Sequence, residues 1–325
     1  MSDRLAAESS IYVAGHRGLV GSALMRALER HGFKRLIVRT HAELDLTDQG
    51  QVREFFAHER PEFVFLAAAK VGGILANETY PADFIQQNLA IESNVLHESW
   101  RRGAKRLIFL GSSCIYPRDC PQPIREEYLL TGPLEPTNQA YAIAKIAGIE
   151  MCAAYNTQHG TRYLCVMPSN LYGSGDNFDL MTSHVLPALV RKAHEAKTRG
   201  ESKVVAWGTG RPRRELLSSD DLAEACVRLM KTDWEEVVAS TPSPRLPLLN
   251  IGTGDDISIA ELMKLVCDTV GFTGRIEWDP SKPDGTPRKL LDVSRMSSLG
   301  WRAKTPLSEG IEAVYRAYLD TEATA

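Results

Sequence analysis

The 325-residue sequence lacks an excess of one charge, a long apolar run and any paired cysteine motif. Lys and Arg number 38 against 41 Asp and Glu, for a net charge of −3, which argues against a protein that binds nucleic acid or a membrane surface. The longest apolar run, residues 63–69, is far shorter than the roughly 18 residues of a membrane span. The six cysteines show no CxxC pair and no Cys/His ligand spacing, so we expect neither disulfides nor a metal site. Residues 1–10 have no secretory pattern, which predicts a cytoplasmic protein.

The first half of the chain alternates β-branched runs with helical patterns, which is typical of βαβ units and a parallel sheet. The patterns predict strands at 11–14, 35–39, 62–68, 106–110 and 163–167. They predict helices at 20–31, 49–58, 81–100 and 141–158. Beyond residue 168 the alternation loosens and the loops lengthen. We therefore expect the second half mainly to bind substrate, with some elements returning to the sheet.

A glycine-rich turn lies between the first predicted strand and the first predicted helix. Its sequence is Gly15-His16-Arg17-Gly18-Leu19-Val20-Gly21, a GxxGxxG motif. Glycines at this place permit a tight turn and let backbone N–H groups and the helix N-terminus approach a pyrophosphate. Three glycines alone could form an ordinary loop, but the strand–turn–helix context predicts dinucleotide binding.

The end of the second predicted strand indicates which dinucleotide is bound. Sites that prefer NAD usually end this strand with an acid that binds the ribose 2′-hydroxyl, but here no acid occurs before Glu43. Arg39, together with Arg17, would suit the 2′-phosphate of NADP, although both could be solvated surface arginines. Asp45 is placed either to contact the adenine edge or to cap a helix.

Tyr141 and Lys145 form a YxxxK motif on a predicted helix. Residues i and i+4 lie on the same helix face, so the lysine ammonium can lower the pKa of the neighbouring tyrosine and can hold a nicotinamide ribose. The tyrosine can then exchange a proton with a carbonyl or an alcohol. The motif is common by chance, and its weight here comes from the glycine-rich turn upstream.

Ser112, Cys114 and His184 are further candidates. If the extended chain continues past Gly111, Ser112 and Cys114 share one face, and Ser112 could bind a carbonyl beside Tyr141. Cys114 is either a small buried filler or a general acid/base, because a thiol titrates within reach of neutral pH. His184 follows a loop at a predicted helix start, where its imidazole is either structural or catalytic.

Six segments together resemble the GDP-L-fucose synthases, the GDP-4-keto-6-deoxy-D-mannose 3,5-epimerase-4-reductases of the extended short-chain dehydrogenase/reductases. The resemblance covers about residues 12–301, and the segments are GHRGLVGSAL, AAAKVGGI, NETYPADFI, LGSSCIYP, EPTNQAYAIAKIAGIEMC and SKPDGTPRKLLD. It implies an α/β fold with a Rossmann-type doubly wound parallel sheet, a smaller C-terminal substrate-binding domain and a homodimer. The implied NADP-binding domain is 1–169, with elements from about 216–256 returning to it, and the substrate-binding domain is 170–215 and 257–325.

The resemblance also implies roles for individual residues in a two-step reaction on GDP-4-keto-6-deoxy-D-mannose. Cys114 and His184 match the acid/base pair that epimerises C3 and C5, and Tyr141, Lys145 and Ser112 match the groups that assist NADPH-dependent reduction at C4. The implied NADP contacts are Gly15, His16, Arg17, Gly18, Leu19, Val20, Gly21, Arg39, His41, Asp45, Leu46, Leu110, Gly111, Ser112, Ser113, Lys145, Pro168, Ser169, Asn170, Leu171 and His184. The implied GDP-sugar contacts are Lys192, Trp207, Arg214 and Asp284.

Some positions depart from the family pattern. Lys192 stands where an arginine commonly contacts the nucleotide, and His41 replaces a frequent second arginine near the 2′-phosphate. The loop 173–181 before His184 and the segment 214–220 also differ from the usual form. These departures affect substrate affinity and coenzyme preference more than the class of reaction.

Two other functions compete with this one. A nucleotide-sugar epimerase or dehydratase that retains NAD would usually have an acid at the end of the second strand, where this chain has Arg39. A catalytically silent NADP-sensing protein would be expected to lack some of Ser112, Tyr141 and Lys145, yet all three are present.

Overall fold

The computed structural model describes residues 4–180, 182–282 and 284–324. The helices with α geometry are α1 (Leu19–Arg30), α2 (Gln49–Glu59), α3 (Ile74–Thr79), α4 (Pro81–Arg101), α5 (Gln139–His159), α6 (Val185–Thr198), α7 (Ser219–Lys231), α8 (Trp234–Ser240), α9 (Ile259–Val270), α10 (Ser294–Ser298) and α11 (Leu307–Thr324). The strands are β1 (Ile11–Ala14), β2 (Leu36–Ile37), β3 (Phe63–Leu66), β4 (Arg106–Leu110), β5 (Tyr163–Pro168), β6 (Asn170–Tyr172), β7 (Lys203–Trp207), β8 (Arg213–Arg214), β9 (Leu216–Ser218), β10 (Leu248–Ile251), β11 (Ile257–Ser258), β12 (Arg275–Asp279) and β13 (Arg288–Lys289).

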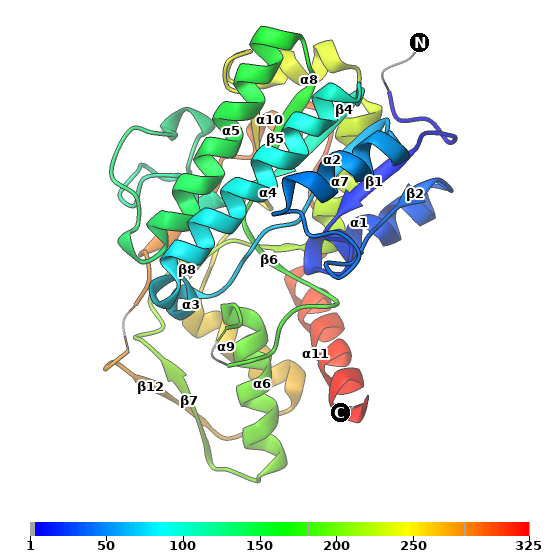
Figure 1. The fold of residues 1–325 in the computed structure, drawn as a ribbon. Helices are drawn as coiled ribbons and strands as arrows, with labels where there is room; N and C mark the ends of the chain where they lie inside the picture. Colours follow the sequence, from blue (N-terminus) through cyan, green and yellow to red (C-terminus); the bar gives the residue numbers. More distant parts are fainter. Residues whose placement is uncertain (1–3, 181, 283, 325) are drawn as a thin grey trace.

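The main sheet has six parallel strands in the order β10-β5-β4-β3-β1-β2 (Figure 1). Because all strands run the same way, their carboxyl ends meet at one edge of the sheet. The strand order reverses between β1 and β3, and ligands of open α/β sheets bind at such a switch point. The predicted parallel α/β fold is confirmed. The second strand is shorter than predicted, Leu36–Ile37 instead of 35–39, because it lies at the sheet edge with a strand on one side only.

Helices cover both faces of this sheet. β1, β3, β4 and β5 are buried along their whole length, as expected for a parallel sheet with two covered faces. On one face α1 and α7 pack together, and Leu24 and Leu222 contribute to the apolar core. On the other face α2, α4 and α5 pack, and α4 and α5 lie side by side (Figure 1).

A further group of elements lies beside the carboxyl edge of the sheet, in the lower part of Figure 1. α6, α9 and α11 pack around an apolar cluster that includes Leu189 and Val266, and β7 pairs with β12. Two small sheets, β11-β8-β13 and β6-β9, complete the set of strands. β10 comes from the second half of the chain and extends the main sheet beside β5. The domain boundaries given above stay a prediction.

In the described ranges 4–180, 182–282 and 284–324, no helix is both long enough and apolar enough to cross a membrane. Within the same ranges, no three His, Cys, Asp or Glu side chains come together as a possible metal site.

Candidate active site

The glycine-rich turn after β1 forms a close-packed backbone cradle at the carboxyl edge of the sheet. Gly15 has a φ of +85°, which favours glycine, and a Cβ there would lie 2.8 Å from the Ala68 nitrogen after β3. A Cβ at Gly21 would lie 2.0 Å from the Gly15 carbonyl oxygen. The turn leads directly into α1, whose first N–H groups face outward at this edge. A pyrophosphate fits a cradle of this form, because side chains are excluded and N–H donors remain.

Unpartnered polar atoms occur in the turn and in the segment after β5. His16 Nδ1 and Ser169 Oγ are buried and have no hydrogen-bond partner among the described residues. The Asn170 side chain donates to the Glu215 carbonyl oxygen at 3.0 Å, and Leu171 packs against the core. Buried polar atoms are rarely left unpaired unless a ligand or water pairs with them, so these residues are consistent with a dinucleotide at this edge.

The segment after β2 contains Arg39, which is already engaged. Its guanidinium pairs with Glu59 at the end of α2 and lies 5.5 Å from the centre of the Phe55 ring. His41 is strongly exposed, and its Nδ1 lies 3.9 Å from Asp45 Oδ1. A 2′-phosphate would therefore compete with Glu59 for Arg39.

The helix-capping alternative for Asp45 is wrong. Its carboxylate accepts hydrogen bonds from the N–H and the hydroxyl of Thr47, at 2.9 and 2.7 Å. The side chain that caps α2 is Asp48, which accepts from the N–H of Gln51 at 3.0 Å. Leu46 lies between these two residues, half-buried against the core.

The chain stays extended only as far as Ser112 and not to Cys114, so the premise that strand alternation pairs these two residues is wrong. A short 3₁₀ turn over Ser113–Ile115 begins directly after Ser112, which caps it. The Cys114 N–H lies 3.5 Å from the Ser112 hydroxyl oxygen. Ser112 and Cys114 are thus brought together by a cap rather than by strand alternation. The preceding Leu110 ends β4 and is buried.

Tyr141 and Lys145 lie one turn apart on α5, as predicted, and Lys145 is fully enclosed. The Lys145 ammonium lies 4.7 Å from the centre of the Phe109 ring and 5.8 Å from that of Tyr141. It forms an ion pair with Glu92 of α4 at 3.1 Å, and each side chain is 1% exposed. Burial raises the pKa of Tyr141 well above its usual value, negative charge at Cys114 and Glu92 raises it further, and the Ser112 hydroxyl lowers it. Tyr141 is therefore a protonated phenol beside Ser112 at neutral pH.

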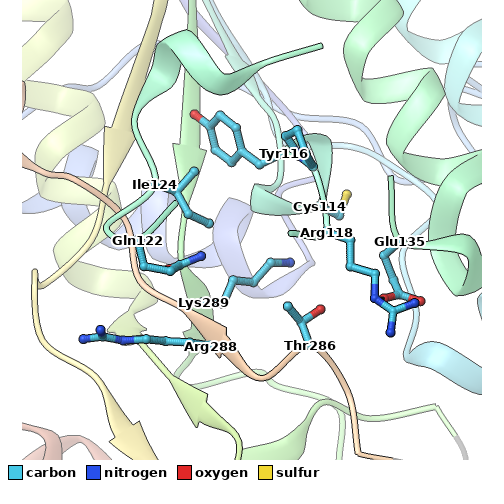
Figure 2. A pocket seen from close by; sticks show the side chains of 10 residues that line it. Cys114, Tyr116, Arg118, Gln122, Ile124, Glu135, Thr286, Arg288 and Lys289 are labelled. Carbon is cyan, nitrogen blue, oxygen red and sulfur yellow. The ribbon is translucent and has the colours of Figure 1, made fainter. Parts of the chain in front are cut away.

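Cys114 lines a small pocket (Figure 2). The lining includes Tyr116 and Ile124 on one side and Arg288 and Lys289 of β13 on another. In Figure 2 the Lys289 side chain extends from β13 towards the Cys114 side of the pocket. Burial raises the pKa of the Cys114 thiol, whereas the Lys289 ammonium lowers it in part. Cys114 is thus a buried residue of the pocket lining, and the Lys289 charge acts on its thiol.

Lys289 differs from the other cations of the pocket because they are paired. Arg118 lies 3.6 Å from Glu135, and Arg288 pairs with Asp256. Within the described part of the chain, Lys289 has no ion pair or hydrogen bond, and burial lowers the pKa of its ammonium. Its charge is available to a thiolate or to an anionic substrate group.

His184 lies at the first residue before α6 and is not among the residues that line the Cys114 pocket. Its loop contacts the start of α3, because the Gly73 N–H donates to the Thr182 carbonyl oxygen at 3.1 Å. The surrounding protein lowers the pKa of the His184 imidazole, which favours the neutral form at pH 7. Residue 181 of the same loop lies outside the described residues.

The four candidate substrate residues form two groups. Lys192 of α6 places its ammonium 4.4 Å from the centre of the exposed Trp207 ring at the end of β7. Arg214 of β8 donates to the carbonyl oxygens of Arg213 and Thr286, and burial lowers its pKa while the nearby Asp284 raises it. Asp284 accepts hydrogen bonds from the N–H and the hydroxyl of Thr209.

Comparison with known proteins identifies the family. A model of the NAD dependent epimerase/dehydratase family matches residues 11–239. The chain belongs to this family. It is 56% identical to GDP-L-fucose synthase 1 of Arabidopsis thaliana, over 98% of this chain and 95% of the relative, and 51% identical to GDP-L-fucose synthase of Escherichia coli K12, over 96% and 97%. A crystal structure of a GDP-L-fucose synthetase from Naegleria fowleri bound to NADP has a TM-score of 0.87 at 27% identity and covers 100% of this chain and 99% of that one. The resemblance to the GDP-L-fucose synthases is confirmed.

The structure places two further residues at the candidate site that were not predicted from the sequence. They are Glu92 and Lys289. Glu92 does have a signal in the sequence, because it lies at helical spacing on the apolar face that Phe84, Ile91 and Val95 bury. A carboxylate on such a face needs a buried partner. Lys289 belongs to the SKPDGTPRKLLD segment, but its approach to Cys114 depends on how β13 pairs with β8.

Proposed function

We propose that the protein converts GDP-4-keto-6-deoxy-D-mannose to GDP-L-fucose in two steps. Both steps take place at the edge of the sheet around Cys114 and Tyr141. The enzyme is an NADPH-dependent oxidoreductase with epimerase activity, like the GDP-L-fucose synthases to which it is 51–56% identical. The observation that carries the assignment of residues is the position of Cys114, which lines a pocket and whose N–H lies 3.5 Å from the hydroxyl oxygen of Ser112.

Epimerisation comes first and needs groups that remove and return protons. Protons on C3 and C5 are acidic because the adjacent C4 ketone stabilises the enolate. Cys114 and His184 exchange these protons on opposite sides of the sugar. The thiol is buried beside the Lys289 cation, and the imidazole is neutral at pH 7, so both groups can change protonation during a turnover.

Reduction of the C4 ketone follows, and the chain supplies the proton and the positioning. The Ser112 hydroxyl binds the C4 oxygen, and the Tyr141 phenol donates a proton to it. Lys145 places a positive charge beside Tyr141, which stabilises the developing phenolate. NADPH, when bound, supplies the hydride.

NADP(H) is the cofactor, and the residues present fit it. The cradle of Gly15 to Gly21 would hold the pyrophosphate, Arg39 with Arg17 the 2′-phosphate, and Lys145 the nicotinamide ribose. His41, Asp45 and Leu46 would lie along the adenosine, and Leu110 to Ser113 and Pro168 to Leu171 along the nicotinamide side. On the substrate, Arg214 would bind the diphosphate with its fork of donors, and Lys192, Trp207 and Asp284 would bind the rest of the GDP moiety.

The competing NAD-retaining epimerase or dehydratase is not favoured. The relatives with more than half of their residues identical to this chain are named GDP-L-fucose synthases. UDP-glucose 4-epimerase structures are only 21–22% identical, which shows the shared fold alone.

The protein is further proposed to be a cytoplasmic homodimer that binds no nucleic acid and no membrane. Support for the dimer comes from Leu89 of α4 and Ile143 of α5, which are 36% and 40% exposed on adjacent helices. Exposed apolar side chains on neighbouring helices are what a helix-to-helix interface between two copies would bury.

The decisive experiment is to incubate purified protein with NADPH and GDP-4-keto-6-deoxy-D-mannose and to identify the product by NMR. We expect NADPH to be oxidised and the product to be GDP-L-fucose. A reduced sugar with the original configuration at C3 and C5 would contradict the epimerase step, and unchanged NADPH absorbance would contradict the whole assignment.

A further inference from the structure

The Lys145 ammonium is compensated by a carboxylate on a different helix. Glu92 lies in the middle of α4, and its Oε1 is 3.1 Å from Lys145 Nζ. Both side chains are 1% exposed, so water screens neither charge. Among the described residues, no well-aligned hydrogen bond reaches either carboxylate oxygen of Glu92. An uncompensated buried charge is costly, so each member of this pair depends on the other for its position.

The fold makes room for this carboxylate. Gly148 of α5 faces Glu92, and a Cβ at this position would lie 2.9 Å from Glu92 Oε2 and 2.5 Å from the Phe109 ring. The glycine thus lets α4 and α5 approach with a carboxylate between them, next to the ring over which the Lys145 ammonium lies. The same ammonium lies 5.8 Å from the centre of the Tyr141 ring.

We propose that Glu92 is a positioning residue for the C4 reduction: its carboxylate holds the Lys145 ammonium against Tyr141 and keeps the Tyr141 hydroxyl protonated until it is needed as a donor. A reductase needs a phenol that carries its proton at neutral pH. Burial raises the pKa of Tyr141, and the Glu92 carboxylate raises it further. Glu92 balances the ammonium and so favours the donor form.

The titratable groups around Glu92 are few. Lys145, Tyr141 and Cys152 of α5 interact with it, and Cys114 from the turn after β4 interacts with Tyr141. Phe109 of β4 contributes an uncharged ring. From α2 and α3, the other helices in contact with α4, no described charged side chain is paired with Glu92. Burial raises the pKa of Glu92, and the Lys145 charge lowers it.

The test is a pH titration of Tyr141 in the Glu92→Gln variant, followed by the absorbance of tyrosinate. The absorbance of the other tyrosines is removed by subtracting the titration of the same protein that also carries Tyr141→Phe. Loss of one nearby charge moves a pKa by about one to three units, so we expect Tyr141 to ionise at lower pH by that amount. The alkaline pH at which the rate of C4 reduction declines is expected to be lower by a similar amount. Glu92→Asp, which keeps the charge, should stay close to the wild type in both measurements.

The matched control is Glu98→Gln, which removes another buried carboxylate of α4. Glu98 is 3% exposed and pairs with Arg101 and Arg102 instead of Lys145. This variant should leave the Tyr141 titration unchanged. If Glu92→Gln does not fold, Glu92→Met replaces the carboxylate with an apolar side chain and is expected to show the same shift.

A Tyr141 titration in Glu92→Gln or Glu92→Met that superimposes on the wild type would overturn the proposal. So would an equal shift in Glu98→Gln, because the effect would then be a general loss of buried charge. The pH profile of reduction rests on the proposed function, but the absorbance titration needs neither substrate nor coenzyme. A protein that makes no GDP-L-fucose would refute the proposed function and still permit the test of Glu92.

Discussion

Cys114 is the residue on which the two-step reaction depends most, because hydride transfer alone needs no thiol at this position. Cys152 and Cys165 belong to an apolar core cluster, whereas Cys114, although buried, lines a pocket together with Lys289. Tyr141 and Lys145, by contrast, are shared with any reductase that uses a YxxxK motif. The two steps should therefore be separable at the level of single side chains.

Cys114→Ser and Tyr141→Phe are expected to fail in different steps. In deuterated water, Cys114→Ser should incorporate much less label at C3 or C5, because a serine hydroxyl does not titrate near neutral pH. Tyr141→Phe should still exchange these protons but reduce the ketone at least about a hundredfold more slowly, the usual contribution of a general acid. Mass spectrometry of the sugar and NADPH absorbance measure the two steps. Undiminished labelling in Cys114→Ser would show that Cys114 does not exchange these protons and only packs against its neighbours.

Lys289→Met should raise the pKa of the Cys114 thiol further. The ammonium is the unpaired cation of the pocket and favours the thiolate, so its removal leaves burial to act alone. We expect iodoacetamide to alkylate Cys114 more slowly at a given pH, measured on the peptide by mass spectrometry. Lys264→Met, an exposed change on α9 outside the pocket, is the control and should not alter this rate. Equal alkylation rates in both variants would argue against the assigned effect of Lys289.

At the scale of elements, the close contact of α4 with α5 leaves little room for a larger side chain. Gly148→Ala would press a methyl group into the Phe109 ring and the Glu92 carboxylate. Overpacking of this kind usually costs about 1–3 kcal/mol, so we expect a lower melting temperature and a slower C4 reduction. Glu150→Ala, an exposed change on the same helix, should have little effect. An unchanged melting temperature in Gly148→Ala would show that the two helices can separate at no cost.

Asp256 stabilises the small β11-β8-β13 sheet through ion pairs with Arg213 and Arg288. Burial raises the pKa of Asp256, but the hydrogen bonds from Arg288 and Arg213 outweigh it, so the pKa is lowered. A lowered pKa stabilises the fold above the usual Asp value of about 3.9, and this stabilisation is lost as the pH falls through the lower folded value.

Asp256→Asn is therefore expected to lower the free energy of unfolding at pH 7 by about 1–2 kcal/mol. The estimate is modest because Arg213 and Arg288 are 41% and 46% exposed and their charges are screened. Urea denaturation at neutral pH and in acid would measure this, with the exposed neighbour Asp255→Asn as control. A loss of stability that is the same at both pH values would contradict the ionic origin.

At the scale of the whole molecule, the proposed dimer makes a prediction about mass. Light scattering should give about twice the 36.0 kDa of one chain for the wild type. Leu89→Glu places a charge on the α4 and α5 surface and should give single chains. Leu319→Glu, at a similarly exposed leucine of α11, should remain a dimer. If the wild-type protein has the mass of one chain, the proposed dimer is wrong.

The sheet and the coenzyme cradle could be predicted because their signals are local. Four buried residues between a polar segment and a glycine turn define β1, and the GxxGxxG motif follows within the next seven residues. Tyr141 and Lys145 were likewise predicted correctly as a helical pair, since the helix period alone places them on one face. The prediction for Ser112 failed in its geometry, because a capped 3₁₀ turn replaces the extended chain.

The amino-acid sequence by itself determined the parallel α/β fold, the glycine cradle, the YxxxK pair and the family, since each depends on patterns that are read within short segments along the chain. Only the tertiary structure decided that Glu92 neutralises Lys145 and that Lys289, 175 positions after Cys114, lines the same pocket. The physical reason is that a buried charge takes its partner from whatever element packs against it. Packing between helices and strand pairing between distant segments, not local periodicity, choose that partner.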